Sequence, residues 1–244
     1  MEKSRPPSDM PTIAERVAEV QERLAQAAGR AGRSPKAVTL VAAAKTRTPE
    51  EVAEVIRAGL THIGENYVQE LLATREAIDK MDLPAVTWHV IGHLQRNKVK
   101  YLQPAPALIH SLDSLALAQE IDRRAGEGGT RQGVLLEVNL AGEETKSGVS
   151  PAEVEALATR VLELPHLELQ GLMAMPPYTE DPETSRPHFR RLRALAEELA
   201  SQGLPPENLR HLSMGMSGDY EVAVEEGATL VRLGTILFGP RAAG

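Results

Sequence analysis

The sequence predicts an α/β fold, a single closed (β/α)8 TIM barrel preceded by one extra helix. Eight short apolar, strand-like segments alternate with helical segments along the chain. Such alternation is typical of parallel βαβ units. Eight units within 244 residues match the size of a closed barrel. An open doubly wound sheet is the alternative that the same alternation permits.

The extra helix is predicted over residues 12–31. The stretch "TIAE" places Glu15 three residues after Thr12, which is a capping box, and apolar residues then recur at helical spacing. We expect this helix beside the barrel or across its N-terminal end. Residues 1–11 are polar and rich in proline and are predicted to be a flexible tail. Residues 12–244 are therefore expected to form the barrel domain.

The eight predicted strands are rich in small and β-branched apolar residues, and turn residues flank them. They are residues 37–44, 61–66, 86–92, 107–113, 133–140, 167–175, 209–215 and 228–234. Helices are expected between them at 48–59, 67–79, 95–102, 114–128, from Pro151 onward, at 182–203 and at 218–227. No linker or shift in composition divides the chain.

Composition and charge exclude several classes of function. The net charge of −7 gives no general basic surface for nucleic acid. Cysteine is absent, which excludes disulfides, thiolate nucleophiles and zinc–cysteine sites, and no metal site is predicted. No apolar run approaches the roughly 20 residues of a membrane helix. The polar N-terminal residues are not followed by an apolar segment, so no signal peptide is predicted. We expect a cytoplasmic protein.

The ends of three predicted strands carry residues that suit one site, because a barrel of this type places its site at the C-terminal ends of its strands. The first strand ends on Lys45. The seventh is followed by "SMGMSGD" (213–219), and the eighth by "RLGT" (232–235). Glycines and hydroxyl groups in such loops are typical of phosphate binding. Barrel closure brings the eighth strand beside the first, so these loops are expected next to Lys45.

This combination favours an aldehyde that also carries a phosphate. A lysine in a partly apolar pocket is favoured as the neutral amine, which can form a Schiff base with a carbonyl group. Pyridoxal 5'-phosphate (PLP) has both groups. Arg232 lies between the two halves of the predicted site and could face the pyridine nitrogen. A cationic arginine there disfavours protonation of that nitrogen and weakens the ring as an electron sink.

Longer motifs then resemble a known family. The stretches are "VAAAKT", "IGENYVQE", "WHVIGHLQRNK", "EVNLAGEETKSGV", "GLMAM", "LSMGMSGDYEVAVEEGAT" and "VRLGTILFG". In this order they resemble the YggS/PROSC family of pyridoxal phosphate homeostasis proteins, over about residues 12–240. The resemblance implies a monomeric fold-type-III PLP barrel similar to the N-terminal domain of alanine racemase. It also implies a non-catalytic carrier of PLP, with apo forms of PLP-dependent enzymes as recipients.

The resemblance also implies roles for particular residues. Lys45 is the Schiff-base lysine, and Arg232 is the contact of the ring nitrogen. Lys146 matches a lysine implicated in cofactor handling. Residues near the ring are Asn66 and His89, and residues at the phosphate are Ser213, Ser217, Gly234 and Thr235, with Met214 in the same loop counted among the cofactor-binding residues.

Each of these residues has an ordinary structural alternative. Lys45 and Lys146 could be solvated lysines, and Arg232 could form a structural salt bridge. The glycine-rich loops could be plain strand-to-helix turns. Two asparagines, Asn66 and Asn139, could cap turns, and His89 could be a packed core histidine.

Two enzyme classes are the alternatives for function. A PLP-dependent amino-acid racemase needs acid–base groups on both faces of the substrate carbon. Related racemases bring a tyrosine from an added domain, whereas the tyrosines here lie within the barrel repeat, at Tyr67, Tyr101, Tyr178 and Tyr220. A Schiff-base aldolase acting on sugar phosphates ranks last, because no carboxylate pair accompanies Lys45.

Overall fold

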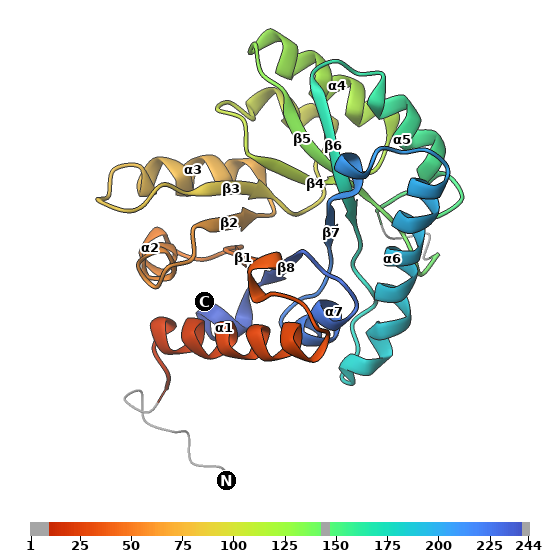
Figure 1. Cartoon of the computed structure of the whole chain (residues 1–244). Helices are drawn as coiled ribbons and strands as arrows, with labels where there is room; N and C mark the ends of the chain where they lie inside the picture. The colour runs from red at the N-terminus through yellow and green to blue at the C-terminus, as the bar shows by residue number, and fades with distance from the viewer. Residues whose placement is uncertain (1–9, 143–146, 241–244) are drawn as a thin grey trace.

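A computed structural model of the chain describes residues 10–142 and 147–240 (Figure 1). Eight parallel strands close into a barrel in sequence order, and the first strand pairs with the last. The predicted (β/α)8 barrel is confirmed, and an open sheet is excluded. The strands are β1 (Thr39–Ala43), β2 (His62–Glu65), β3 (Thr87–Val90), β4 (Leu108–Leu112), β5 (Gln132–Glu137), β6 (Leu167–Met173), β7 (His211–Ser213) and β8 (Leu230–Leu233).

Helices follow the strands on the outside of the barrel (Figure 1). The α-helices are α1 (Ile13–Arg30), α2 (Pro49–Arg57), α3 (Val68–Ile78), α4 (Leu115–Glu127), α5 (Val154–Leu162), α6 (Arg186–Ser201), α7 (Tyr220–Glu225) and α8 (Thr235–Phe238). Short 3-10 helices are η2 (Pro35–Ala37), η3 (Arg96–Tyr101), η4 (Pro182–Ser185) and η5 (Pro206–Leu209). The predicted helix at 95–102 is therefore a 3-10 helix, and α8 was not predicted.

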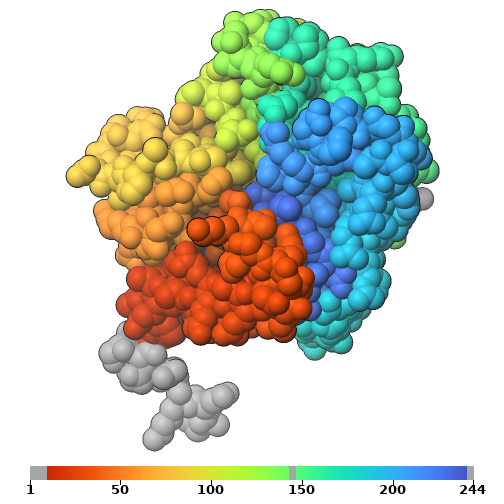
Figure 2. Space-filling model, viewed as in Figure 1, coloured from red at the N-terminus to blue at the C-terminus, as the bar shows by residue number. Residues whose placement is uncertain are grey.

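The extra helix α1 lies beside the barrel, where it packs against α2, α7 and α8. Two arginines of α1 form ion pairs with α7: Arg23 with Glu221 at 2.6 Å, and Arg30 with Glu225 at 2.7 Å. Figure 2 shows the red to orange N-terminal part of the described chain bordering the blue C-terminal part. The predicted capping box at Thr12 and Glu15 is present.

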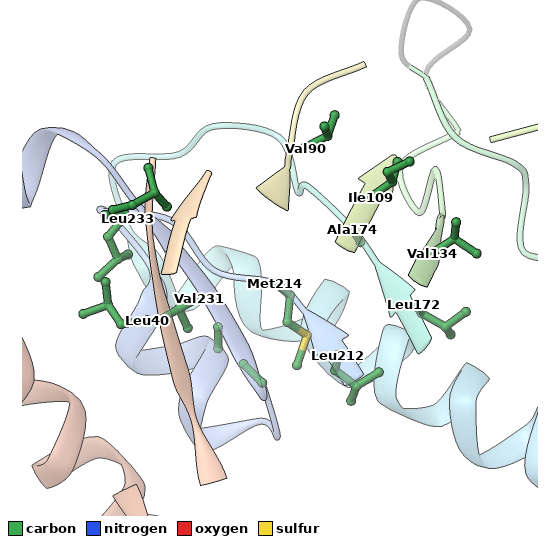
Figure 3. Close-up of a cluster of buried hydrophobic side chains, with 14 of the residues drawn as sticks. Leu40, Val90, Ile109, Val134, Leu172, Ala174, Leu212, Met214, Val231 and Leu233 are labelled. Carbon is green, nitrogen blue, oxygen red and sulfur yellow. The ribbon is translucent and has the colours of Figure 1, made fainter. Parts of the chain in front are cut away.

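The alternation of side chains along each strand divides the core into two layers. One set points outward and packs under the helices (Figure 3). Its members include Leu40, Val90, Ile109, Val134, Leu172, Leu212, Met214 and Val231. The other set fills the barrel interior with Val41, Ile91, Leu108, Leu135, Met173 and Leu230. This inner layer is small, and buried polar side chains complete it.

No helix in the described part of the chain is long and apolar enough to cross a membrane. Within residues 10–142 and 147–240, no group of three or more histidine, aspartate or glutamate side chains is arranged to hold a metal ion.

Glu65 ends β2 and is a buried acid outside the barrel interior. Thr74 of α3 donates a hydrogen bond to its Oε1 at 3.1 Å, and its Oε2 has no partner among the described residues. Burial raises the pKa of Glu65 to about 7, and the nearby charge of Glu70 adds to the shift. The folded state therefore binds one more proton than the unfolded state between the ordinary pKa of 4.5 and about 7.

The stabilisation from this proton is complete below the unfolded pKa and is lost as the pH rises through the folded pKa. Glu65→Gln removes the ionisation. We therefore expect the change it causes in the free energy of unfolding to be more favourable near pH 8 than near pH 5, by about 2 to 3 kcal/mol. Urea unfolding of both proteins at the two pH values measures this difference. Glu54→Gln, at an exposed position of α2, is the control. An equal effect of Glu65→Gln at both pH values would contradict the prediction.

Candidate functional site

A cavity of about 460 Å³ opens at the C-terminal ends of the strands, where the sequence predicted the site. This volume suits a small-molecule ligand. The loops after β1, β2, β3, β6, β7 and β8 contribute to its lining. The predicted site residues that line it are Lys45, Asn66, Ser217, Arg232, Gly234 and Thr235.

Lys45 follows β1 in a tight turn that directs the chain into α2. The N–H of Arg47 donates to the carbonyl oxygen of Ala44 at 2.8 Å and closes this turn. Thr46 has a φ of 62°, which is strained for a β-branched residue and is typical of a functional site. Among the described residues, none forms a hydrogen bond or ion pair with the Lys45 amine. The half-buried amine is therefore available to a ligand.

The loops after β7 and β8 meet at Ser217. The N–H groups of Gly234 and Ile236 point at its Oγ, at 3.3 and 3.4 Å. Thr235 adds an exposed hydroxyl, and a Cβ built on Gly218 would meet nothing within 4 Å. Converging backbone N–H groups, hydroxyls and open space suit the oxygens of an anion. The two loops therefore meet as predicted, and their phosphate-binding role stays a prediction.

Arg232 of β8 lies at the floor of the cavity as a buried cation. It donates to the Oγ of Ser213 at 2.5 Å and to the carbonyl oxygen of Ala174 at 3.2 Å. Burial lowers the pKa of Arg232 to about 10, although the carboxylates of Glu137 and Asp219 oppose the shift. The guanidinium group therefore stays charged at neutral pH. Arg232 forms no ion pair within 4 Å of a described residue. The geometry therefore does not support the alternative of a structural salt bridge.

Asn66 comes directly after β2 and borders the cavity beside Gly92. A Cβ on Gly92 would lie 2.7 Å from the Cα and backbone oxygen of Asn66, so only glycine permits this approach. Ser111 donates to the carbonyl oxygen of Gly92 at 2.6 Å and so helps to hold this backbone segment in place. Close backbone packing therefore joins the loop after β2, which contains Asn66, to the loop after β3, which contains Gly92.

Three predicted residues are buried and do not line the cavity. Met214 directly follows β7, and its side chain points outward into the hydrophobic layer (Figure 3). Ser213 contacts Arg232 and His110. His89 sits deep in the interior between two other histidines, which corresponds to the packed alternative. Lys146 lies outside the described residues, and its role stays a prediction.

The structure adds cavity residues that sequence reasoning missed. The loop after β6 contributes residues 175 and 177–179, including Tyr178 at 88% exposure. Its sequence "MPPYT" carries no ligand-binding motif, so only the position of this loop after a strand could have indicated that it belongs to the site. Arg47 also lines the cavity, where Glu51 and the backbone of Gly239 hold its guanidinium group.

A buried acid lies near the cavity on β5. Glu137 accepts a hydrogen bond from Ser147, a lining residue, at 2.6 Å, and its Oε2 has no partner among the described residues. Burial raises the pKa of Glu137, and Asp113 adds to the shift. Asn139 accepts from the N–H of Gly142 at 3.0 Å, which agrees with the turn-capping alternative.

Comparison with known proteins identifies the class of this barrel. A family model described as "Alanine racemase, N-terminal domain" matches residues 16–242. An alanine racemase of Clostridium difficile shares the fold, with a TM-score of 0.67 at 15% identity, over 92% of this chain and 61% of that one. At this identity the likeness concerns the fold alone.

Closer relatives define the family. The chain is 51% identical to the pyridoxal phosphate homeostasis protein of Aquifex aeolicus, over 93% of this chain and 97% of that protein. It is 44% identical to the protein of the same name from Pseudomonas aeruginosa, over 95% and 97%. The chain belongs to the family of pyridoxal phosphate homeostasis proteins. A solved structure of PipY from Synechococcus elongatus, described as having PLP bound, superposes with a TM-score of 0.82 at 37% identity, over 93% and 100%.

Proposed function

We propose that this chain holds PLP as a Schiff base on Lys45 and serves in its intracellular homeostasis. The observation that carries the proposal is the cavity itself. An amine without a partner among the described residues lies in the same cavity as the converging donors around Ser217. An amine for the aldehyde and a cradle for the phosphate are the two groups that PLP requires. The names of the relatives and the PLP-bound structure of PipY support the same ligand.

The residues present fit the cofactor in three ways. The Lys45 amine would bond to the aldehyde carbon, with water as the leaving group. Ser217, Gly234 and Thr235 would hold the phosphate through hydroxyl and backbone N–H groups. The guanidinium group of Arg232, fixed at the floor, would face the ring nitrogen. Ser213 would act below Arg232, and not at the phosphate.

The charge of Arg232 favours holding the cofactor over using it. When bound, PLP supplies an electron sink for carbanion chemistry, and this sink is strongest when its ring nitrogen is protonated. A neighbouring cation disfavours that protonation. Because Arg232 stays charged at neutral pH, it would keep the sink weak. This supports a carrier that delivers PLP to apoenzymes. We further propose that it is a monomer and works in the cytoplasm.

Borohydride reduction tests the attachment. We expect the purified, PLP-loaded protein to be yellow and to yield, after reduction and digestion, one pyridoxyl-modified peptide that contains Lys45. Lys45→Ala should abolish the modification, because the amine is lost. Lys80→Ala, at an exposed position paired with Glu76, is the matched control and should leave it unchanged. Modification of a different lysine in the unaltered protein, Lys146 included, would contradict the assignment.

The phosphate cradle has a separate test. We expect Thr235→Val to raise the Kd for PLP by roughly 10-fold or more, because a hydrogen bond to a charged group contributes about 1.5 to 3 kcal/mol. Binding of pyridoxal, which lacks the phosphate, should stay unchanged. Absorbance titrations with both ligands measure the two effects. Thr159→Val on the exposed face of α5 is the control. Equal weakening of both ligands would place the phosphate elsewhere.

A racemase is the second function to test, since the barrel shares its fold with alanine racemase. Incubation of the PLP-loaded protein with single enantiomers of amino acids should leave them unracemised, as followed by chiral chromatography. Robust turnover that disappears in Lys45→Ala would overturn the carrier function.

A further inference from the structure

A column of hydrogen-bonded histidines crosses the barrel interior and ends at Arg232. The Nδ1 of His62 lies 3.0 Å from the Nε2 of His89, and the Nδ1 of His89 lies 3.0 Å from the Nε2 of His110. The Nδ1 of His110 lies 2.8 Å from the Oγ of Ser213, which accepts from Arg232. One continuous chain of hydrogen bonds thus reaches the cavity floor.

The stagger of the strands produces this column. His62 of β2 pairs with Thr87 of β3, so His89 lies two residues further along. His89 pairs with Leu108 of β4, so His110 again lies two residues further along. A step of two residues preserves the inward direction of the side chain and rises by about 6.6 Å. The imidazoles therefore climb from the N-terminal end of the barrel towards the cavity.

The two ends of the column have different surroundings. His62 is half-buried and borders a hollow of about 390 Å³ at the N-terminal end of the strands, together with Lys36 and Gln21. His89 and His110 are buried. The outer end can exchange protons with solvent, whereas the inner members cannot do so directly.

One arrangement of protons satisfies every contact of the column, and in it each group donates towards His62. Arg232 can only donate, so Ser213 accepts from it, and the hydroxyl proton of Ser213 needs a further acceptor. The Nδ1 of His110 is that acceptor. His110 then carries its proton on Nε2 and donates to His89. His89 in turn carries its proton on Nε2 and donates to the Nδ1 of His62.

We propose that His62, His89, His110 and Ser213 form a directed relay that positions Arg232, and that protonation of His62 reverses its direction. A doubly protonated His62 donates from Nδ1 and can no longer accept from His89. To reach this state, His89 passes its Nε2 proton to the Nδ1 of His62, and His110 passes its Nε2 proton to the Nδ1 of His89. Ser213 passes its hydroxyl proton to the Nδ1 of His110, and a proton taken up at the cavity floor restores the Ser213 hydroxyl. His89 and His110 then carry their protons on Nδ1. His110 would donate to Ser213, whose hydroxyl proton loses its acceptor, and the bond between Ser213 and Arg232 is perturbed.

The charges around the column agree with a neutral resting state. Burial lowers the pKa of His89 to about 3 and that of His110 well below its ordinary value, and it also lowers the pKa of His62. His211 on β7 faces both inner histidines, and Arg232 faces His110. Lys36 lies at the outer end, and Glu137 faces Arg232. Protonation is therefore expected first at His62, which is the least buried member.

The proposal makes His62, His89 and His110 positioning residues for the cofactor site. The effect on the cofactor site rests on the proposed binding of PLP, whereas the relay and its reversal do not. The charge of His62 at one end of the barrel would thus be coupled to the contact between Ser213 and Arg232 at the other end by proton positions alone.

Nitrogen NMR of the full chain without cofactor tests the relay, with the imidazole signals and the Arg232 side-chain N–H signals followed from about pH 8 to about pH 5.5. As His62 titrates, below its ordinary pKa of about 6.5, the proton of His110 should move from Nε2 to Nδ1. The Arg232 signals should shift with the same midpoint. In His62→Gln both transitions should disappear, because the amide oxygen accepts from His89 and does not titrate in this range.

His211→Asn is the matched control, since His211 is a half-buried interior histidine outside the column, and it should keep both transitions. An unchanged tautomer of His110 down to about pH 5.5, or the same transitions in His62→Gln, would overturn the relay. In the PLP-loaded proteins, the absorbance spectrum should change with the same midpoint in wild type and not in His62→Gln. A wild-type protein that gives no PLP spectrum would defeat the proposed function and leave the NMR result on the relay intact.

Discussion

The buried cation of Arg232 is the constraint on which the upper half of the barrel depends. A charged guanidinium group in an apolar interior is unfavourable unless its donors are satisfied. Ser213 and the backbone of Ala174 accept two of its hydrogen bonds, while Glu137 and Asp219 supply opposite charge without forming a close ion pair. Neutral histidines behind Ser213 add no positive charge. Arg232 also lines the cavity, so the same residue borders the space for a ligand.

Much of the fold could be predicted from the sequence, because local signals and barrel topology agree. Alternating strands and helices gave the closed barrel, and the capping box at Thr12 gave the start of α1. The predicted boundaries of elements were less accurate next to turns. The 3-10 helix η5 ends at Leu209, so β7 begins later than predicted, and α5 begins at Val154, three residues after Pro151. The position of α1 is set by its packing against α2, α7 and α8, which is a tertiary effect that no local pattern reports.

The site was predictable where it follows strand ends and less so where it depends on side-chain direction. Lys45, Asn66, Ser217, Gly234 and Thr235 reach the cavity because loops after strands converge there. Two residues of one motif do not line the cavity. Ser213, at the end of β7, is buried against Arg232, and Met214, directly after β7, points outward into the hydrophobic layer. The histidine column was beyond sequence reasoning, because its three members come from separate strands and meet only through the stagger of the barrel.

The proposed function needs a barrel that holds PLP by three separated groups. These are the amine after β1, the hydroxyl and N–H groups of the loops after β7 and β8, and the cation at the floor. A high-resolution crystal structure of the PLP-loaded protein tests this account most directly. The account predicts continuous density from the Nζ of Lys45 to the cofactor, the phosphate at Ser217, Gly234 and Thr235, and Arg232 at the ring nitrogen. Density for PLP that leaves Lys45 free, or that places the phosphate away from these loops, would contradict it.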